Sequence, residues 1–110
     1  MELSGRPGIR VFVYGEEIDM RTGFSKLHGI VIEKMRANLF DGNLFVFLGK
    51  NPRRAKVLQF DGSGLRLTVK RLDRGTFMKV SDFFATPEIS YDELNRLLDG
   101  VNLSGIGCND

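Results

Sequence analysis

Apolar and polar positions along this 110-residue chain change their period several times, and each period predicts a different element. Residues 9–14 (IRVFVY) are β-branched and aromatic, which is typical of a strand. In the next stretch, apolar side chains recur at helical spacing: Phe24, Leu27, Ile30, Val31 and Met35. They predict an amphipathic helix over about residues 22–36, with this apolar stripe facing the core.

The middle of the chain predicts three strands. Residues 44–48 (LFVFL) are apolar on both faces and too few for a helix, so they predict a central strand covered on both sides. Phe45 and Phe47 are therefore interpreted as core residues rather than as aromatics that stack on bases. Residues 56–60 and 65–70 flank the loop DGSG and predict an antiparallel hairpin.

Pairing Phe60 with Leu65 would divide this hairpin into an apolar face and a polar face. The apolar face would carry Lys56, Leu58, Leu67 and Val69, and the exposed face Gln59, Arg66, Thr68 and Lys70. Lys56 is the exception on the apolar side, and we expect its ammonium to reach water at the sheet margin. After the turn LDRG, residues 76–80 predict one more short strand.

The last element is a helix with clear end signals. Ser90 and Glu93 form a capping box, and Ile89 and Leu94 stand at the positions of a hydrophobic staple. The buried stripe and the terminating glycine are Leu94, Leu97, Leu98 and Gly100. The predicted fold class is α+β, a single domain over residues 1–110 in which a mainly antiparallel sheet of four to five strands packs with two helices. We expect loose ends at about 1–8 and 103–110.

Charge is unevenly distributed, although the formal net charge is only +2. Between Gly49 and Lys79 the chain has nine basic and two acidic residues, a net charge of +7, while the remainder has seven basic and twelve acidic residues, a net charge of −5. The central segment therefore predicts a negatively charged partner. Its candidate nucleic-acid-binding residues are Lys50, Arg53, Arg54, Lys56, Arg66, Lys70, Arg71 and Arg74. The loop GKNPRRAK and the turn KRLDRG are expected to meet at the same end of the hairpin and form one surface.

The patterns of known catalytic sites are missing. One histidine (His28) and one cysteine (Cys108), far apart, do not make a zinc site or a triad, and we expect His28 to be solvated or hydrogen-bonded. Asp61 and Asp73 stand in turns, where backbone hydrogen bonding explains an aspartate better than a metal does. The sequence predicts no enzyme and no cofactor. A nuclease using Asp19 or Asp61 is a remote alternative.

Targeting signals and membrane spans are also missing from the sequence. No apolar run approaches the length of a bilayer span, and the first residues have no hydrophobic signal core. We therefore expect a soluble, cytoplasmic chain without a membrane or small-molecule partner.

Several separate blocks of the chain resemble the accessory-protein family of IS66-type insertion sequences, the TnpB or second-open-reading-frame proteins. The blocks are DMRTGF (19–24), LFVFLGK (44–50), KVLQFDGSG (56–64), KRLDRGTF (70–77) and LLDGVN (97–102). They occur in the family's order from about Arg10 to Asn102. Besides Lys56, Lys70, Arg71 and Leu72, the matching motif positions are Asp19, Arg21, Gly23, Asp61, Gly62, Gly64, Gly75 and Phe77. Met78 and Lys79 stand where family members usually have a Trp-Pro-like pair.

The resemblance implies a small bacterial protein that is encoded beside an acid-triad transposase and needed with it for efficient transposition. Members are not known as catalysts. Two roles stay open from the residues: binding of the element's DNA through the basic hairpin, or docking of the basic surface on an acidic patch of the cognate transposase.

Overall fold

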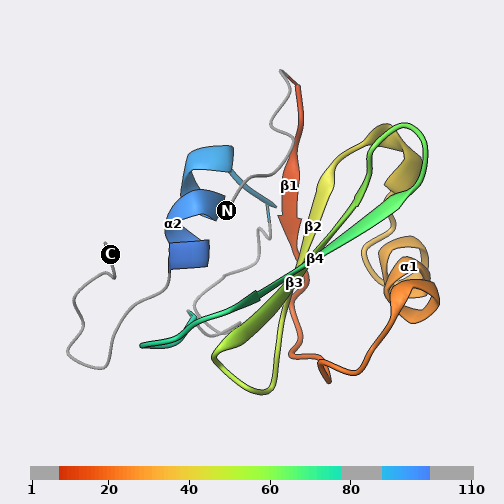
Figure 1. Ribbon diagram of the computed structural model, residues 1–110. Helices are drawn as coiled ribbons and strands as arrows, with labels where there is room; N and C mark the ends of the chain where they lie inside the picture. The colour runs from red at the N-terminus through yellow and green to blue at the C-terminus, as the bar shows by residue number, and fades with distance from the viewer. Residues whose placement is uncertain (1–7, 78–87, 100–110) are drawn as a thin grey trace.

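A computed structural model describes residues 8–77 and 88–99, and in these residues one sheet lies between two helices (Figure 1). The strands are β1 (Val11–Val13), β2 (Leu44–Leu48), β3 (Arg54–Phe60), β4 (Leu65–Arg71) and β5 (Glu88–Ile89). The helices are α1 (Phe24–Glu33) and α2 (Tyr91–Asp99), with a short 3-10 helix η1 (Leu39–Asp41) between α1 and β2. The predicted α+β class is confirmed.

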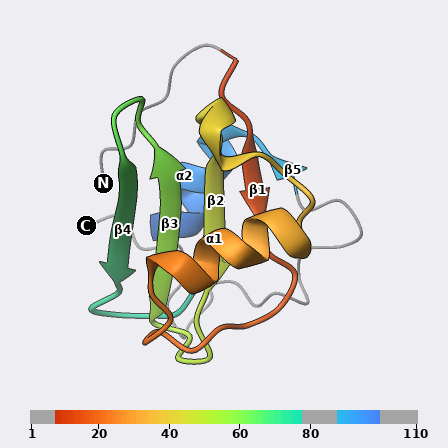
Figure 2. The ribbon, with the colours of Figure 1, turned by 90° about the vertical axis from the view of Figure 1, so that its right-hand side faces the viewer.

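The order of strands across the sheet is β4-β3-β2-β1-β5, so β2 is central, as the sequence predicted (Figure 2). All five residues of β2 are buried because α1 covers one face of the sheet and α2 the other. β1 and β2 are parallel, and α1 forms the crossover between them. The remaining pairs are antiparallel.

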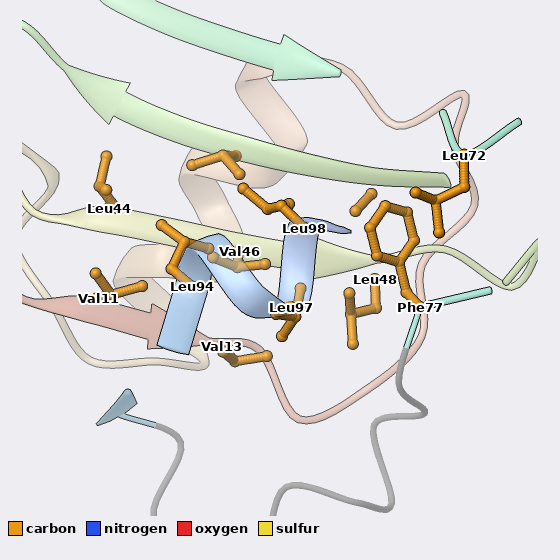
Figure 3. Close-up of a cluster of buried hydrophobic side chains, with 12 residues drawn as sticks. Val11, Val13, Leu44, Val46, Leu48, Leu72, Phe77, Leu94, Leu97 and Leu98 are labelled. Carbon is orange, nitrogen blue, oxygen red and sulfur yellow. The ribbon is translucent and has the colours of Figure 1, made fainter. Parts of the chain in front are cut away.

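Two apolar cores follow from this arrangement, one on each face of the sheet. On the α2 face the cluster includes Val11, Val46, Val57, Leu72, Phe77, Leu94 and Leu98 (Figure 3). On the α1 face it includes Ile18, Leu27, Val31, Phe45, Phe47 and Leu58. Phe45 and Phe47 are fully buried, which confirms their interpretation as core residues.

The register of the β3–β4 hairpin is as predicted, with Phe60 opposite Leu65. The expectation of one face open to water was wrong for β3, because Ala55 and Val57 alternate onto the α2 face and are buried there. Gln59 is buried as well, and its side-chain amide donates to the carbonyl of Gly42 at 3.2 Å. On that face of the hairpin, the described polar side chains that remain at least partly exposed are those of β4, the outer strand: Arg66, Thr68 and Lys70.

Two predicted core residues lie at the surface. Val69 faces the α1 side of β4 but is 56% exposed, because β4 is the outermost strand. Phe24 is 44% exposed, because it is the first residue of α1, ahead of the buried pair Leu27 and Val31.

The capping box of α2 is confirmed in both directions. The backbone N–H of Glu93 donates to Oγ of Ser90 at 3.0 Å, and the N–H of Ser90 donates to Oε1 of Glu93 at 3.0 Å. Leu94, Leu97 and Leu98 are buried, as the spacing predicted. None of the helices in residues 8–77 and 88–99 is long and apolar enough to cross a membrane. Several sequence predictions lie outside the described residues: the loose ends except for Gly8, most of the strand at 76–80, Gly100 and Cys108.

Candidate nucleic-acid interface

The β2–β3 loop and the segment that follows β4 meet at one end of the sheet, the lower end in Figure 2. The N–H of Leu72 donates to the carbonyl of Arg53 at 2.8 Å, and the N–H of Phe77 donates to the carbonyl of Pro52 at 2.7 Å. The guanidinium of Arg53 also donates to the carbonyl of Asp73 at 3.3 Å. The predicted meeting of loop and turn is therefore confirmed.

Apolar side chains fix this turn to the core. Leu72 and Phe77 belong to the cluster on the α2 face, and Figure 3 shows them at the same end of that cluster as Leu48. Gly75 between them has φ +72°, a left-handed conformation that favours glycine. Gly75 therefore forms the turn, and Phe77 anchors it in the core.

A third segment, residues 18–23, closes the same end of the sheet. The N–H of Lys50 donates to the carbonyl of Ile18 at 2.9 Å. Gly49 lies so close to Met20 that an added Cβ would stand 2.9 Å from the Met20 Cε. Residues 18–23, the β2–β3 loop and the turn after β4 are thus packed together at this end of the sheet.

The basic end, as we name it, consists of Lys50, Arg53, Arg54, Lys70, Arg71 and Arg74. All are exposed except Lys70, which is half-buried. Within residues 8–77 and 88–99, no carboxylate lies within 4.0 Å of the side-chain nitrogens of Lys50, Arg54 or Arg71. These cations are therefore available to an anion from outside the described structure.

Arg54 and Arg71 lie directly opposite each other in the β3–β4 ladder. Like charges in this position destabilise a sheet, and an anion bound between them would remove the repulsion. Sequence reasoning missed this pair because it began one strand at Lys56 and ended the other at Lys70. Continuing the predicted register beyond the Lys56–Val69 pair to the next pair on the same face would have placed Arg54 opposite Arg71.

Two predicted interface residues lie elsewhere. Lys56 is only 8% exposed, and its ammonium donates to the carbonyl of Thr22 at 2.8 Å. The interpretation of Lys56 as a marginal, water-reaching lysine was wrong, because β3 continues to Arg54 and the chain before α1 covers this position. Arg66 is exposed but lies at the opposite end of the hairpin, near Asp61.

The acidic motif residues have local structural partners. Oδ1 of Asp61 accepts hydrogen bonds from the N–H groups of Ser63 and Gly64 at 3.0 and 3.1 Å, and these bonds lower the pKa of the Asp61 carboxyl. Gly62 supplies the left-handed turn position with φ +101°. The turn interpretation of Asp61 is confirmed.

Asp19 is paired within its own turn. Its carboxylate accepts from the guanidinium of Arg21 at 2.7 Å and from the Arg21 N–H at 2.8 Å, which lowers the pKa of Asp19. Gly23 caps the start of α1 with extended backbone. Across the described part of the chain, no three His, Cys, Asp or Glu side chains group as metal ligands would.

The expectation that His28 is solvated or hydrogen-bonded was wrong for one of its two ring nitrogens. His28 is half-buried, its Nε2 is buried without a hydrogen-bond partner among the described residues, and its ring meets Phe40 edge-on at a centroid distance of 5.8 Å. Phe40 itself is 60% exposed and also contacts Phe60, with ring centroids 5.0 Å apart. No pattern in the sequence predicts the contact between His28 and Phe40, because it joins η1 to the side of α1 that lies off the apolar stripe.

A groove of about 590 Å³ lies along β1, between this strand and the segment that follows α1. Its lining includes Phe12, Tyr14, Lys34 and Arg36. Arg10 also lines it, but Glu88 neutralises this guanidinium at 2.6 Å. The groove is thus less consistently basic than the basic end.

Comparison with known proteins identifies the family. The family model described as IS66 Orf2-like protein matches residues 9–107. Two proteins of Sinorhizobium fredii, both described as uncharacterized, are similar to the chain. The protein y4hO is 42% identical over 94 residues, which cover 86% of this chain and 82% of y4hO. The protein y4jC is 30% identical over 95 residues, which cover 86% of this chain and 81% of y4jC.

No solved structure matches the chain. The family match spans nearly all of the described residues, including both loops of the basic end. The chain therefore belongs to the IS66 Orf2-like family, whose members have an accessory role in insertion-sequence transposition.

Proposed function

We propose that this protein is a non-catalytic accessory protein of transposition that binds the DNA of its insertion sequence through the basic end. The observation that carries the proposal is the opposition of Arg54 and Arg71 on adjacent strands, with no described carboxylate within 4.0 Å of either. A phosphate group between two such guanidinium groups accepts charge-assisted hydrogen bonds from both. The protein acts in the bacterial cytoplasm, where the element's DNA and its transposase meet.

The other cations extend this contact along the DNA backbone. Lys50 and Arg53 come from the β2–β3 loop, and Arg74 from the turn after β4. Because the two loops are hydrogen-bonded to each other through their backbones, the positions from which these side chains extend are held in a fixed arrangement. Phosphate contacts of this kind give affinity and salt dependence but little choice of sequence, so recognition of the element's ends needs the transposase or DNA shape as well.

The test measures binding of a fluorescent duplex carrying the element's terminal repeat at about 50 mM salt, where phosphate contacts are strong. The variant Arg54→Glu/Arg71→Glu replaces one like-charge pair by another, so its stability should change little. We expect its affinity to fall on the order of a hundredfold, because two attractive contacts become repulsive.

The matched control is Lys34→Glu/Arg36→Glu, which changes the net charge equally but lies at the groove remote from the basic end. Its affinity should stay within about threefold of the unmodified protein, since exposed charges beyond a Debye length are screened. Equal losses in the two variants would show a response to net charge alone and would contradict the proposal.

The second candidate is a module that docks the same basic end on an acidic patch of the transposase without touching DNA. The exposure of the cations favours it as well, because an acidic protein surface also neutralises them. Co-purification of the two chains after nuclease treatment, lost in Arg54→Glu/Arg71→Glu, would support docking. Absence of association with or without DNA would remove this candidate.

A further inference from the structure

The edge of β4 that faces away from β3, and that pairs with no other described strand, is a second candidate binding surface. Among the described strands, β4 pairs with β3 alone. Two backbone hydrogen bonds flank this ladder: the N–H of Leu72 donates to the carbonyl of Arg53 at 2.8 Å, and the N–H of Asp61 donates to the carbonyl of Gly64 at 3.0 Å. These bonds fix which backbone groups of β4 point outward.

Hydrogen-bonded and non-hydrogen-bonded pairs alternate in an antiparallel ladder. Since the two flanking pairs are hydrogen-bonded, the pairs formed by Arg66, Thr68 and Lys70 with β3 are hydrogen-bonded too. The other β4 residues direct their backbone N–H and C=O groups away from β3: Leu65, Leu67, Val69 and Arg71. An unpaired row of this kind is a template for another strand.

The side chains of β4 specify the chemistry of that strand. On the α1 face, Leu67 is half-buried and Val69 is 56% exposed, which offers an apolar row. On the α2 face, Arg66 is exposed and Lys70 half-buried, which offers two cations separated by Thr68. In an antiparallel addition, the residues opposite these cations form non-hydrogen-bonded pairs, in which side chains approach most closely.

We propose that the edge of β4 takes an extended segment of a partner protein in which apolar and acidic residues alternate, added antiparallel to β4. The apolar residues lie beside Leu67 and Val69, and the acidic residues lie opposite Arg66 and Lys70. Backbone hydrogen bonds supply affinity, and the alternation supplies specificity. The inference does not depend on DNA binding by the basic end.

A second copy of the chain fits this edge less well. Two β4 strands related by a two-fold axis would keep their α2 faces on the same side of the joined sheet. Arg66 and Lys70 of both copies would then gather on that face, and cations opposite one another destabilise strand pairing. The charge on this edge discourages self-association in the way that basic edge strands commonly do.

The probe is a fluorescein-labelled peptide of sequence Thr-Glu-Val-Glu-Val-Glu-Thr with both ends blocked. Binding to the full chain is measured by fluorescence anisotropy, and amide hydrogen exchange is followed by NMR. We expect the saturating peptide to slow exchange of the Leu67 and Val69 N–H groups at least tenfold. The Arg66→Glu/Lys70→Glu variant and a peptide with Lys in place of Glu should each lose binding.

Two controls separate strand addition from attraction of charge alone. N-methylation of both valines removes backbone donors that would face β4 and should weaken binding at least tenfold without changing the peptide's charge. The variant Val69→Pro removes an outward N–H but no β3–β4 hydrogen bond, so it should weaken peptide binding equally and leave duplex DNA binding unchanged. Circular dichroism checks the fold of Val69→Pro. If this variant does not fold, the comparison of the methylated and unmethylated peptides tests strand addition without it.

Three results would overturn the proposal. Equal binding of the methylated and unmethylated peptides would show that charge alone attracts the probe. Protection of Leu67 and Val69 that rises with protein concentration without peptide would assign the edge to a second copy. Loss of DNA binding in folded Val69→Pro would assign the edge to nucleic acid.

Discussion

The ammonium group of Lys56 donates a hydrogen bond to the carbonyl of Thr22 at 2.8 Å and is almost removed from solvent. This bond joins the hairpin to the chain just before α1. From the sequence, Lys56 was a candidate phosphate ligand. In the structure, its ammonium is bound to a backbone carbonyl instead. Lys56 therefore stabilises the fold, whereas the exposed cations of the basic end are the candidates for binding a ligand.

Replacing Lys56 by methionine should therefore affect stability and not DNA affinity. The substitution keeps the apolar stem and leaves the Thr22 carbonyl without its donor, which should cost about 1–3 kcal/mol of unfolding free energy. Urea denaturation measures this loss, with Lys34→Met as an exposed control that should change stability by less than about 0.5 kcal/mol. A Lys56→Met protein of normal stability that binds DNA weakly would instead place Lys56 at the interface.

Glycine at position 49 should be required by packing. A Cβ there would lie 2.9 Å from Cε of Met20 and 3.0 Å from the carbonyl oxygen of Arg54. Gly49→Ala should lower the free energy of unfolding by about 1–3 kcal/mol, as overpacking does elsewhere. Gly15→Ala is the matched control, because a Cβ at Gly15 meets nothing within 4 Å. Equal stability of the two variants in thermal melts would contradict the close packing of the loop at Gly49.

Acid should weaken the hairpin turn through Asp61. Its folded-state pKa is lowered by hydrogen bonds from Ser63 and Gly64, so the folded protein binds this proton less tightly than the unfolded chain. The stabilisation is complete above the unfolded pKa of about 4 and is lost as pH falls through the lowered folded pKa. In Asp61→Asn, the side-chain oxygen can still accept these hydrogen bonds, but the side chain no longer ionises.

The measurement is the melting temperature of both proteins between pH 7 and pH 3, at constant ionic strength. Wild type should be the more stable at pH 7, and its advantage over Asp61→Asn should shrink toward pH 3. If the difference in melting temperature between the two proteins stayed constant over this range, the turn would not stabilise the ionised carboxylate of Asp61.

The opposed pair Arg54 and Arg71 should lower the stability of the protein and strengthen its binding to DNA. Replacing Arg71 by threonine removes the repulsion and should raise the free energy of unfolding by about 0.2–1 kcal/mol at low salt. The gain should diminish in high salt, since screening already relieves the repulsion in wild type. The same variant should bind the terminal-repeat duplex more weakly. A destabilised Arg71→Thr protein in urea titrations would contradict the repulsion.

Local signals in the sequence were sufficient for most of the fold. The Ser90–Glu93 capping box predicted the start of α2, and the DGSG loop with its flanking alternation predicted the β3–β4 register. These features depend on neighbouring residues, so a single sequence contains them.

The tertiary features could not be predicted in the same way. That α2 packs on the face opposite α1, and so buries Ala55 and Val57, is set by contacts far apart in the chain. The same applies to Lys56, whose partner Thr22 is 34 positions away. In the candidate site, the clustering of the two loops and the position of Arg66 beside the DGSG loop followed from the hairpin register. The burial of Lys56 away from the basic end required the structure.

The central claim is that the basic end binds DNA phosphates, and the salt dependence of binding tests it most directly. The logarithm of the association constant for the terminal-repeat duplex is measured against the logarithm of salt concentration. About five phosphate contacts predict a slope of roughly −4 to −5, and Arg54→Glu/Arg71→Glu should reduce its magnitude by about 2. A slope near zero, or the same slope in this variant as in wild type, would contradict the account.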